Sequence, residues 1–276
     1  MTTRIHVLVD DRTAAPGLAT EHGLALWLEH GGHTVLFDTG TSGRVLEANA
    51  AALGVRLEQA EALCLSHGHY DHTGGLGAVL ERLRGVDLFA HPAVFVPKYA
   101  RRADGWEEIG MRLSREQLEA AGLRLHLSEG PQEVCPGATL LGEVAREPRL
   151  VPASSHLYIE HPSGRQVDPF PDDQAIALIG RDGLIVVSGC AHAGIVNHCR
   201  AAQEFTGERR LRAVVGGFHL VGCTQALLDA TIEAFRELAP EAIHPCHCTG
   251  EPAMAALTRA FPHRCAPIAA GAILEW

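Results

Sequence analysis

Short apolar runs separated by polar turns occupy most of the chain, and they predict strands. Several of these runs are rich in Val, Ile and Leu and end in Asp, Gly or His, which is typical of buried strands. Two apolar runs within 175–189 are joined by Arg181-Asp182-Gly183, which favours a hairpin. The predicted strands lie within residues 4–11, 24–30, 33–39, 61–66, 87–91, 123–129, 138–144, 175–189, 210–217, 241–247 and 271–276.

Helical periodicity occurs between these runs, in segments where apolar residues recur every three or four positions. The predicted helices lie within 42–54, 76–84, 193–205, 224–239 and 251–261. The first of them ends at Gly54, a residue typical of helix C-termini. Strands alternating with helices indicate sheets covered by helices, so the predicted class is α/β. No low-complexity linker divides the chain, and we expect one domain over 1–276.

Composition and charge restrict the function further. The chain has 276 residues, of which 46% are hydrophobic, but no apolar run reaches the roughly 18 residues of a membrane helix. The start lacks a signal-peptide pattern, so we expect a cytoplasmic protein whose eight cysteines are thiols. A net charge of −10 argues against a nucleic-acid surface. An anionic small-molecule substrate stays compatible with it, because bound metals would dominate the local field. Nothing in the sequence indicates an oligomeric state.

The segment SHGHYDHTGG at 66–75 gathers three histidines and an aspartate after a predicted buried strand. His67 and His69 are two apart, so on an extended chain they face the same side. Asp71 and His72 follow and can face a second centre, and the glycines at 74–75 are expected to turn the chain tightly into the next helix. Imidazoles and a carboxylate are ligands of divalent transition metals. A loop whose histidines merely cap the backbone is the alternative, and it explains one histidine better than three.

Three later histidines also follow apolar strands. His247 and His192 are predicted metal ligands, with a helix cap as the alternative for His192. His219 follows two glycines that permit close backbone approach, and it is interpreted as a substrate-binding residue, a ligand or a core histidine. The polar, turn-rich residues 92–122 are interpreted as an insertion over the face that carries this chemistry, with a loop or disorder as the alternative.

These motifs resemble the HxHxDH signature of the metallo-β-lactamase superfamily, whose members are metal-dependent hydrolases built as a four-layer αββα sandwich. The likeness continues, in the expected order, at VLFDTG (35–40), VVSGCAHAG (186–194) and IHPCHCTG (243–250). Within the superfamily, the chain most resembles the dihydropterin-ribofuranosylaminobenzene phosphate synthase subfamily. The motifs that carry this narrower resemblance are EHGLALWLE, DDQAI, GGFHL and HCTG. The resemblance implies two divalent metal ions, with zinc expected and iron or manganese as alternatives. His22 belongs to the first of these subfamily motifs, but its spacing indicates no role.

The chain departs from the superfamily pattern at two positions. Where the family has a metal-binding histidine before the hairpin, this chain has Asp172-Asp173. Asp173 either replaces that histidine or serves a turn or cap. Where the family has a bridging aspartate, this chain has Cys190, and either Cys190 or His192 takes that place. A thiolate there would suit zinc or iron, whereas a small buried cysteine would leave the second site weak.

The predicted function follows from this ligand set. Two metals about 3.5–4 Å apart can hold a hydroxide and polarise the attacked bond. Asp71 is the expected catalytic carboxylate, and Asp38 is expected to hold a ligating histidine in its tautomer. Lys98, Arg101 and Arg102 are interpreted as a solvated basic run or as contacts for an anionic tail. The leading prediction is a metallohydrolase that uses a metal-bound hydroxide to cleave a small ester, phosphate esters included. A synthase-like transferase and a non-hydrolytic iron redox enzyme are the alternatives.

Overall fold

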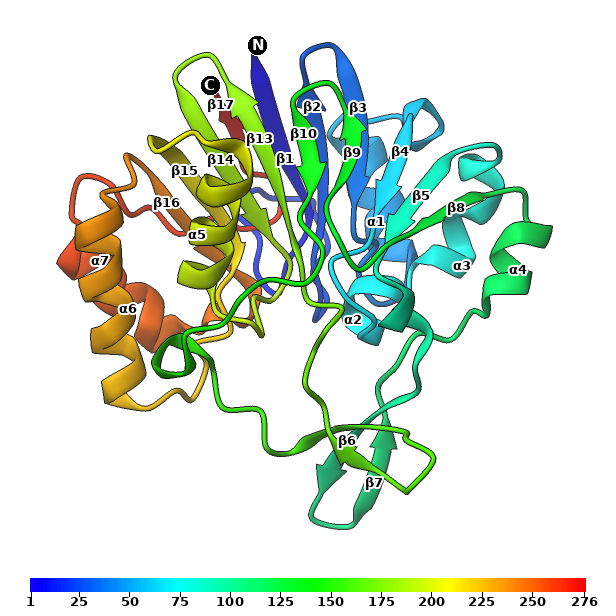
Figure 1. The fold of residues 1–276 in the computed structure, drawn as a ribbon. Helices are drawn as coiled ribbons and strands as arrows, with labels where there is room; N and C mark the ends of the chain where they lie inside the picture. The colour runs from blue at the N-terminus through cyan, green and yellow to red at the C-terminus, as the bar shows by residue number, and fades with distance from the viewer.

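Two large β-sheets face each other at the centre of the computed structural model, which describes residues 1–276 (Figure 1). The first sheet has the strand order β17-β1-β2-β3-β4-β5-β8 and the second β16-β15-β14-β13-β10-β9. The strands of the first sheet are β1 Thr3–Val9, β2 Ala25–His30, β3 His33–Phe37, β4 Ala62–Cys64, β5 Asp87–Ala90, β8 Arg124–Leu127 and β17 Ile273–Glu275. Those of the second are β9 Gln132–Cys135, β10 Ala138–Leu140, β13 Ala175–Gly180, β14 Gly183–Ser188, β15 Leu211–Gly217 and β16 Ile243–Cys246.

Both faces of the central strands are apolar because each sheet packs on two sides. In β14, Ile185 and Val187 contact the opposite sheet, whereas Leu184 and Val186 face the helices outside. The predicted four-layer αββα arrangement is therefore confirmed. The helices over the first sheet are α1 Arg44–Ala52, α3 Leu76–Val79 and α4 Arg115–Ala120, and those over the second are α5 Ile195–Thr206, α6 Gln225–Leu238 and α7 Glu251–Ala260.

The candidate ligand loops lie at one end of the sandwich because the strands that precede them are paired in parallel. β3 pairs in parallel with β4, and β14, β15 and β16 are parallel neighbours. Loops at the carboxyl ends of parallel strands lie together, and binding sites commonly form there. The loops after β3, β4, β14, β15 and β16 carry Asp38, the 66–72 segment, Cys190, His219 and His247. Both chain termini lie at the other end of the sandwich (Figure 1).

A small third sheet projects beyond the loop end (Figure 1). Its order is β12-β11-β6-β7, from β6 Lys98–Arg102, β7 Gly105–Glu108, β11 Leu157–Ile159 and β12 Gln166–Val167. The predicted insertion is thus ordered, and a disordered loop is wrong for this segment. Its bounds need correction, because α4 returns to the main body, where Leu118 packs in the outer core of the first sheet. The sequence did not indicate β11 and β12, which are short and partly exposed.

No helix of the structure combines the length and the apolar character that crossing a bilayer requires.

Candidate metal centre

Two groups of metal-binding side chains meet at the loop end of the sandwich. We call His67, His69 and His192 the three-histidine cluster, and Asp71, His72, Cys190 and His247 the mixed cluster. All seven side chains are buried, and within each cluster the ligand-type atoms lie within 4.8 Å of one another. Two further groups overlap with them, one of Cys190, His192 and His219 and one of Asp11, His22 and His247.

The segment after β4 divides its side chains between the two clusters. His67 Nε2 lies 3.0 Å from His69 Nδ1. The short helix α2, Tyr70–Thr73, begins directly after His69 and turns Asp71 and His72 towards the mixed cluster. The tight turn expected at Gly74-Gly75 is wrong, because both glycines have helical φ angles of −68° and −70°. They are needed for space instead, since a Cβ at Gly75 would lie 2.1 Å from the carbonyl oxygen of Thr39.

Asp38 lies behind this segment and is fully buried. Its Oδ1 accepts a hydrogen bond from the Ser66 amide at 2.7 Å, and its Oδ2 accepts one from Ser66 Oγ at 2.6 Å. The same Oδ2 lies 2.6 Å from His72 Nδ1. A carboxylate at that distance fixes the Nδ1–H tautomer, so that the lone pair of Nε2 faces the cluster. His72 Nε2 accordingly lies 3.2 Å from Cys190 Sγ and 3.6 Å from Asp71 Oδ2.

Cys190 and His192 belong to different clusters. The chain is not extended between them, because Ala191 has a left-handed φ of 60°. His192 joins the three-histidine cluster, where the Phe170 ring stacks on it with a centroid distance of 4.1 Å. Cys190 Sγ joins the mixed cluster but also lies within reach of His192 and His219. Burial and the neighbouring Cys248 raise the pKa of the Cys190 thiol. Cys190 therefore stands between the two clusters.

His247 is held by two carboxylates that sequence reasoning missed. Its amide donates to Asp10 Oδ1 at 2.7 Å, and its Nδ1 lies 2.6 Å from Asp11 Oδ1. The other oxygen of Asp11 lies 2.8 Å from His22 Nδ1, so one carboxylate orients two imidazoles. Both His22 Nε2 and His247 Nε2 lie 3.4 Å from Asp71 Oδ2. The sequence feature that could have revealed these two carboxylates is the acidic pair Asp10-Asp11. It follows the first strand, at the same end of the sandwich as the other ligand loops.

Asp173 lies outside both clusters. Its Oδ2 accepts a hydrogen bond from the Ala193 amide at 2.7 Å and lies 3.2 Å from His198 Nε2. Neither interpretation of Lys98, a solvated basic residue or a contact for an anionic tail, is right, because its side chain is only 1% exposed and pairs with two aspartates. Arg101 and Arg102 are exposed as expected.

The donors of the two clusters fit divalent metal ions. His69 Nε2, both ring nitrogens of His192 and His247 Nε2 are buried and have no hydrogen-bond partner. Burial lowers the pKa of His67 and His192 well below the usual value and that of His69 to about 3, so all three are neutral with free lone pairs. Burial raises the pKa of Asp71, but His72 and His247 outweigh this effect and hold that pKa low. Burial lowers the pKa of His247, but Cys248, Asp11 and Asp71 outweigh it and raise that pKa well above the usual value, so this imidazole must release a proton to bind a metal. The three neutral imidazoles, the ionised carboxylate and the Cys190 thiol form a zinc-type donor set.

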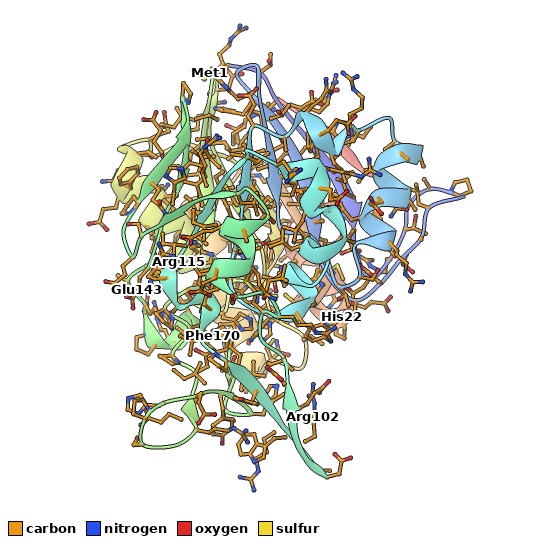
Figure 2. The ribbon with its side chains drawn as sticks, turned by 90° about the vertical axis from the view of Figure 1, so that its right-hand side faces the viewer. Met1, His22, Arg102, Arg115, Glu143 and Phe170 are labelled. Atoms are coloured by element: carbon orange, nitrogen blue, oxygen red, sulfur yellow. The ribbon has the colours of Figure 1, made fainter.

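A cavity of about 430 Å³ opens onto these donors. His69, Asp71, His192, His219 and His247 line it, together with the apolar side chains of Ile109, Leu157, Val221 and Met254. Arg12 and Arg102 also line it, and Figure 2 shows Arg102 on the projecting sheet beyond His22 and Phe170. A volume of this size suits a small molecule.

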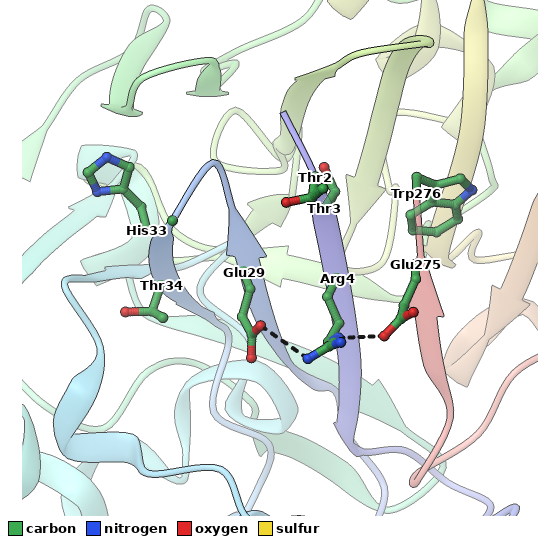
Figure 3. A pocket seen from close by; sticks show the side chains of 9 residues that line it. Thr2, Thr3, Arg4, Glu29, His33, Thr34, Glu275 and Trp276 are labelled. Atoms are coloured by element: carbon green, nitrogen blue, oxygen red, sulfur yellow. Dashed lines mark hydrogen bonds and ion pairs between the residues drawn. The ribbon is translucent and has the colours of Figure 1, made fainter.

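A second cavity, of about 600 Å³, lies near the chain termini (Figure 3). It contains no such cluster, and its central cation, Arg4, is already paired with Glu275 at 2.6 Å and with Glu29 at 3.7 Å. The smaller cavity is therefore the candidate site.

Comparison with known proteins agrees with this geometry. Residues 20–203 match the family model described as the metallo-beta-lactamase superfamily. This chain belongs to the metallo-beta-lactamase superfamily. Among curated superfamily relatives, it is 31% identical over 242 residues to the 7,8-dihydropterin-6-methyl-4-(beta-D-ribofuranosyl)-aminobenzene-5'-phosphate synthase of Methanocaldococcus jannaschii, covering 84% of this chain and 82% of that one. An uncharacterised protein of the same organism is 30% identical over 257 residues, covering 92% and 94% of the two chains.

A solved structure extends the likeness over the whole fold. The crystal structure of a metal-dependent hydrolase of the beta-lactamase superfamily superposes with a TM-score of 0.84 at 32% identity, covering 99% of both chains. The superfamily is enzymatic and typically binds divalent metals, so the two clusters lie in a fold suited to metal-dependent catalysis.

Proposed function

We propose that the protein is a metal-dependent hydrolase that cleaves a small ester, with phosphate esters among its substrates. The three-histidine cluster would hold one divalent ion and the mixed cluster a second, with zinc expected in both. The observation that carries the proposal is that two donor groups, with Cys190 between them, open onto one cavity of small-molecule size. The hydrolase of known structure supports the reaction class.

Divalent metals at such sites lower the pKa of water towards neutrality and polarise the bond under attack. The residues of the chain supply the remaining chemistry. Asp71 is ionised, and its Oδ2 lies 3.4–3.6 Å from the Nε2 atoms of His22, His72 and His247, so it is the carboxylate that orients a nucleophile. His22 at the mouth of the cavity can exchange protons with solvent, because 56% of its side chain is exposed.

Binding of an anionic substrate is supported by the cavity walls. Arg12 and Arg102 both line the cavity and carry permanent positive charge. Arg102 Nε already pairs with Glu107 Oε2 at 2.6 Å, whereas the carboxylate contact of Arg12 Nε, with Asp10 Oδ2, is 3.9 Å long, so Arg12 is the cation more available to an anionic group. Ile109 and Leu157 from the projecting sheet, with Val221 and Met254 from the main body, offer apolar contact. The proposed substrate is therefore a small molecule with an apolar part and an anionic group.

A transferase related to the archaeal synthase is the second candidate. The identity of 31% over 84% of the chain to a protein named as a synthase favours it. The same metals would then stabilise a departing anionic group in place of activating water.

A substrate panel separates the two candidates. Zinc-loaded protein would be assayed with phosphodiesters, lactones and pterin diphosphates, and turnover of the phosphodiesters or lactones in water is the expected result. Turnover of only the pterin diphosphate, and only with an amine acceptor, would favour the transferase.

Variants test whether any turnover belongs to this site. His69→Ala should abolish it while the circular dichroism spectrum stays that of a folded protein, because the sandwich core holds the loop. His33→Ala is the control, since His33 is a partly exposed histidine at the opposite end. An unfolded His69→Ala protein, or one with full activity, would count against the proposed role of the cluster.

A further inference from the structure

Two consecutive carboxylates lie directly behind the three-histidine cluster. Asp172 and Asp173 precede β13, and both are buried, at 0% and 1% exposure. Asp172 Oδ2 accepts a hydrogen bond from the Gly68 amide at 2.8 Å. Asp173 Oδ2 accepts one from the Ala193 amide at 2.7 Å. Gly68 lies between His67 and His69, and Ala193 follows His192, so each carboxylate holds one of the two loops that form the cluster.

The next residue, Gln174, ties the same segment to the strand that leads into the cluster. Its amide donates to the carbonyl oxygen of Ser66 at 3.0 Å, and its Nε2 donates to that of Leu65 at 3.2 Å. Its Oε1 accepts a hydrogen bond from the Gly142 amide at 2.9 Å. The segment 172–174 therefore spans between the two sheets at the base of the ligand loops and has little freedom to move.

Lys98 fixes Asp172 from the other side. Its Nζ lies 3.0 Å from Asp172 Oδ1 and 2.9 Å from Asp168 Oδ2, and all three side chains are almost fully buried. Burial lowers the pKa of Lys98, but the two carboxylates outweigh it and raise that pKa, so the ammonium stays charged. Charge-assisted hydrogen bonds are about twice as strong as neutral ones, so a charged partner orients Asp172 firmly.

The space around Gly68 shows that this arrangement is close-packed. A Cβ at Gly68 would lie 2.4 Å from the carbonyl oxygen of Val94 and 3.1 Å from Lys98 Cε. The loop between the two histidines is thus confined by the β6 segment on one side and bonded to Asp172 on the other. Lys98 is the first residue of β6, so its buried ion pair with Asp172 connects the projecting sheet to the carboxylate that holds the loop.

We propose that Asp172 and Asp173 are positioning residues that set the distance between the His67–His69 loop and the His192 loop, with Lys98 holding Asp172 in place. This chain then needs no additional histidine before the hairpin, because a pair of carboxylates preorganises the three that are present. The inference rests on the proposed metal centre. It assigns Asp173 a role other than metal ligation.

The test compares isosteric variants of two aspartates that share Lys98. In Asp172→Asn, the amide group turns its NH₂ towards either Gly68 N–H or Lys98, so one of these donors loses its acceptor. In Asp168→Asn, one of two donors likewise loses its acceptor. Here the donors are Lys98 and the Phe170 amide, whose hydrogen bond to Asp168 Oδ1 is 2.6 Å long. The two changes are matched in charge, burial and shared partner. Only Asp172 bonds to the backbone between two candidate ligands.

Affinities for Zn²⁺ and Co²⁺ would be measured by competition with a chromophoric chelator. Loss of an outer partner of a metal ligand typically weakens metal affinity 10–100-fold. Asp172→Asn and Asp173→Ala, which removes the acceptor of the Ala193 amide, should each weaken one of two binding events by about that factor, and Asp168→Asn should stay within about threefold of wild type. Cobalt spectra should retain the thiolate charge-transfer absorption from Cys190, because the mixed cluster keeps its donors.

The outcomes separate this inference from the proposed function. Wild-type protein that binds no divalent metal would refute both. Wild-type protein that binds two ions, with Asp172→Asn and Asp173→Ala binding both at wild-type affinity, would overturn the positioning role alone. Equal weakening by Asp168→Asn would also overturn it, because the effect would then come from the ionic contact or from the Phe170 ring, which stacks on His192 and whose backbone amide bonds to Asp168. If Asp172→Asn does not fold, Asp172→Glu takes its place, since it keeps the charge opposite Lys98 while moving the acceptor away from Gly68.

Discussion

Replacing Asp38 with asparagine removes a charge from the base of the mixed cluster without changing the shape of the side chain. Asp38 has a left-handed φ of 59°, which Asn adopts as readily as Asp, so the backbone contributes little to the difference. The amide oxygen can still accept from the Ser66 amide, and the Ser66 hydroxyl can reverse to accept from the new NH₂. The Nδ1–H of His72, which faces Asp38 Oδ2 at 2.6 Å, then meets a donor.

The magnitude follows from the hydrogen bonds. One charge-assisted bond contributes about 1.5–3 kcal/mol, and a buried donor without an acceptor costs about 1–3 kcal/mol. These two ranges describe overlapping consequences of one contact, so we expect the free energy of unfolding to fall by about 2–4 kcal/mol. If His72 instead changes tautomer, its Nε2 carries the proton and faces Cys190 with no lone pair. Either way, metal affinity at the mixed cluster should fall about 10–100-fold.

Urea unfolding of chelator-treated protein, followed by circular dichroism, would measure the stability effect without a metal contribution. Chelator competition would then measure the affinity effect. Ser66→Ala is the control, because it removes one hydroxyl but leaves the contact of Asp38 with His72, and it should cost about 1 kcal/mol. An Asp38→Asn protein within about 0.5 kcal/mol of wild type and with unchanged affinity would refute the argument that Asp38 sets the state of His72.

Three further predictions concern the same loops. His192→Ala should lower the metal content from two ions to one per chain by elemental analysis, since both its ring nitrogens lack protein partners; retention of two ions would contradict this. Burial lowers the pKa of His69 in the folded protein to about 3, whereas a histidine in the unfolded chain has a pKa near 6.5. The unfolded chain therefore takes up the proton first, and the folded state loses stability as the pH falls below about 6.5. Between pH 7 and 5 this amounts to about 2 kcal/mol, and metal-free His69→Gln should lose that much less in urea unfolding than wild type. Gly189→Ala should destabilise the protein by at least about 2 kcal/mol in the same assay, because its Cβ would lie 2.1 Å from Ser66 Oγ; wild-type stability would mean that Ser66 moves freely.

The clustering of candidate ligands at 66–72 could be predicted from the sequence because its signal is local. Three histidines within six positions follow an apolar run, and the onset of α2 separates them into two groups as their spacing predicts. The contacts of Asp11 with both His22 and His247 could not be predicted in this way. These histidines are 11 and 236 residues away from Asp11, and no local pattern joins single residues over such distances.

The other differences between the predicted and the observed structure have three separate causes. Cys190 and His192 diverge because Ala191 is left-handed, a conformation that neither propensity nor periodicity predicts for alanine. Lysine is rarely buried, and only the convergence of Asp168 and Asp172 from a distant segment makes the burial of Lys98 tolerable. The strands β11 and β12 escaped prediction because their short length and partial exposure give no apolar alternation.

The long reach of the contacts around His247 has a consequence for synthesis on the ribosome. The chain emerges N-terminal end first, and its early segments can begin to fold while later ones are still being made. All members of the three-histidine cluster have been translated by residue 192, whereas the mixed cluster waits for His247, whose amide bonds to Asp10 across 237 positions. The two halves of the centre therefore become available in a fixed order during translation. A chain truncated before β16 would carry all three side chains of the three-histidine cluster but only three of the four of the mixed cluster.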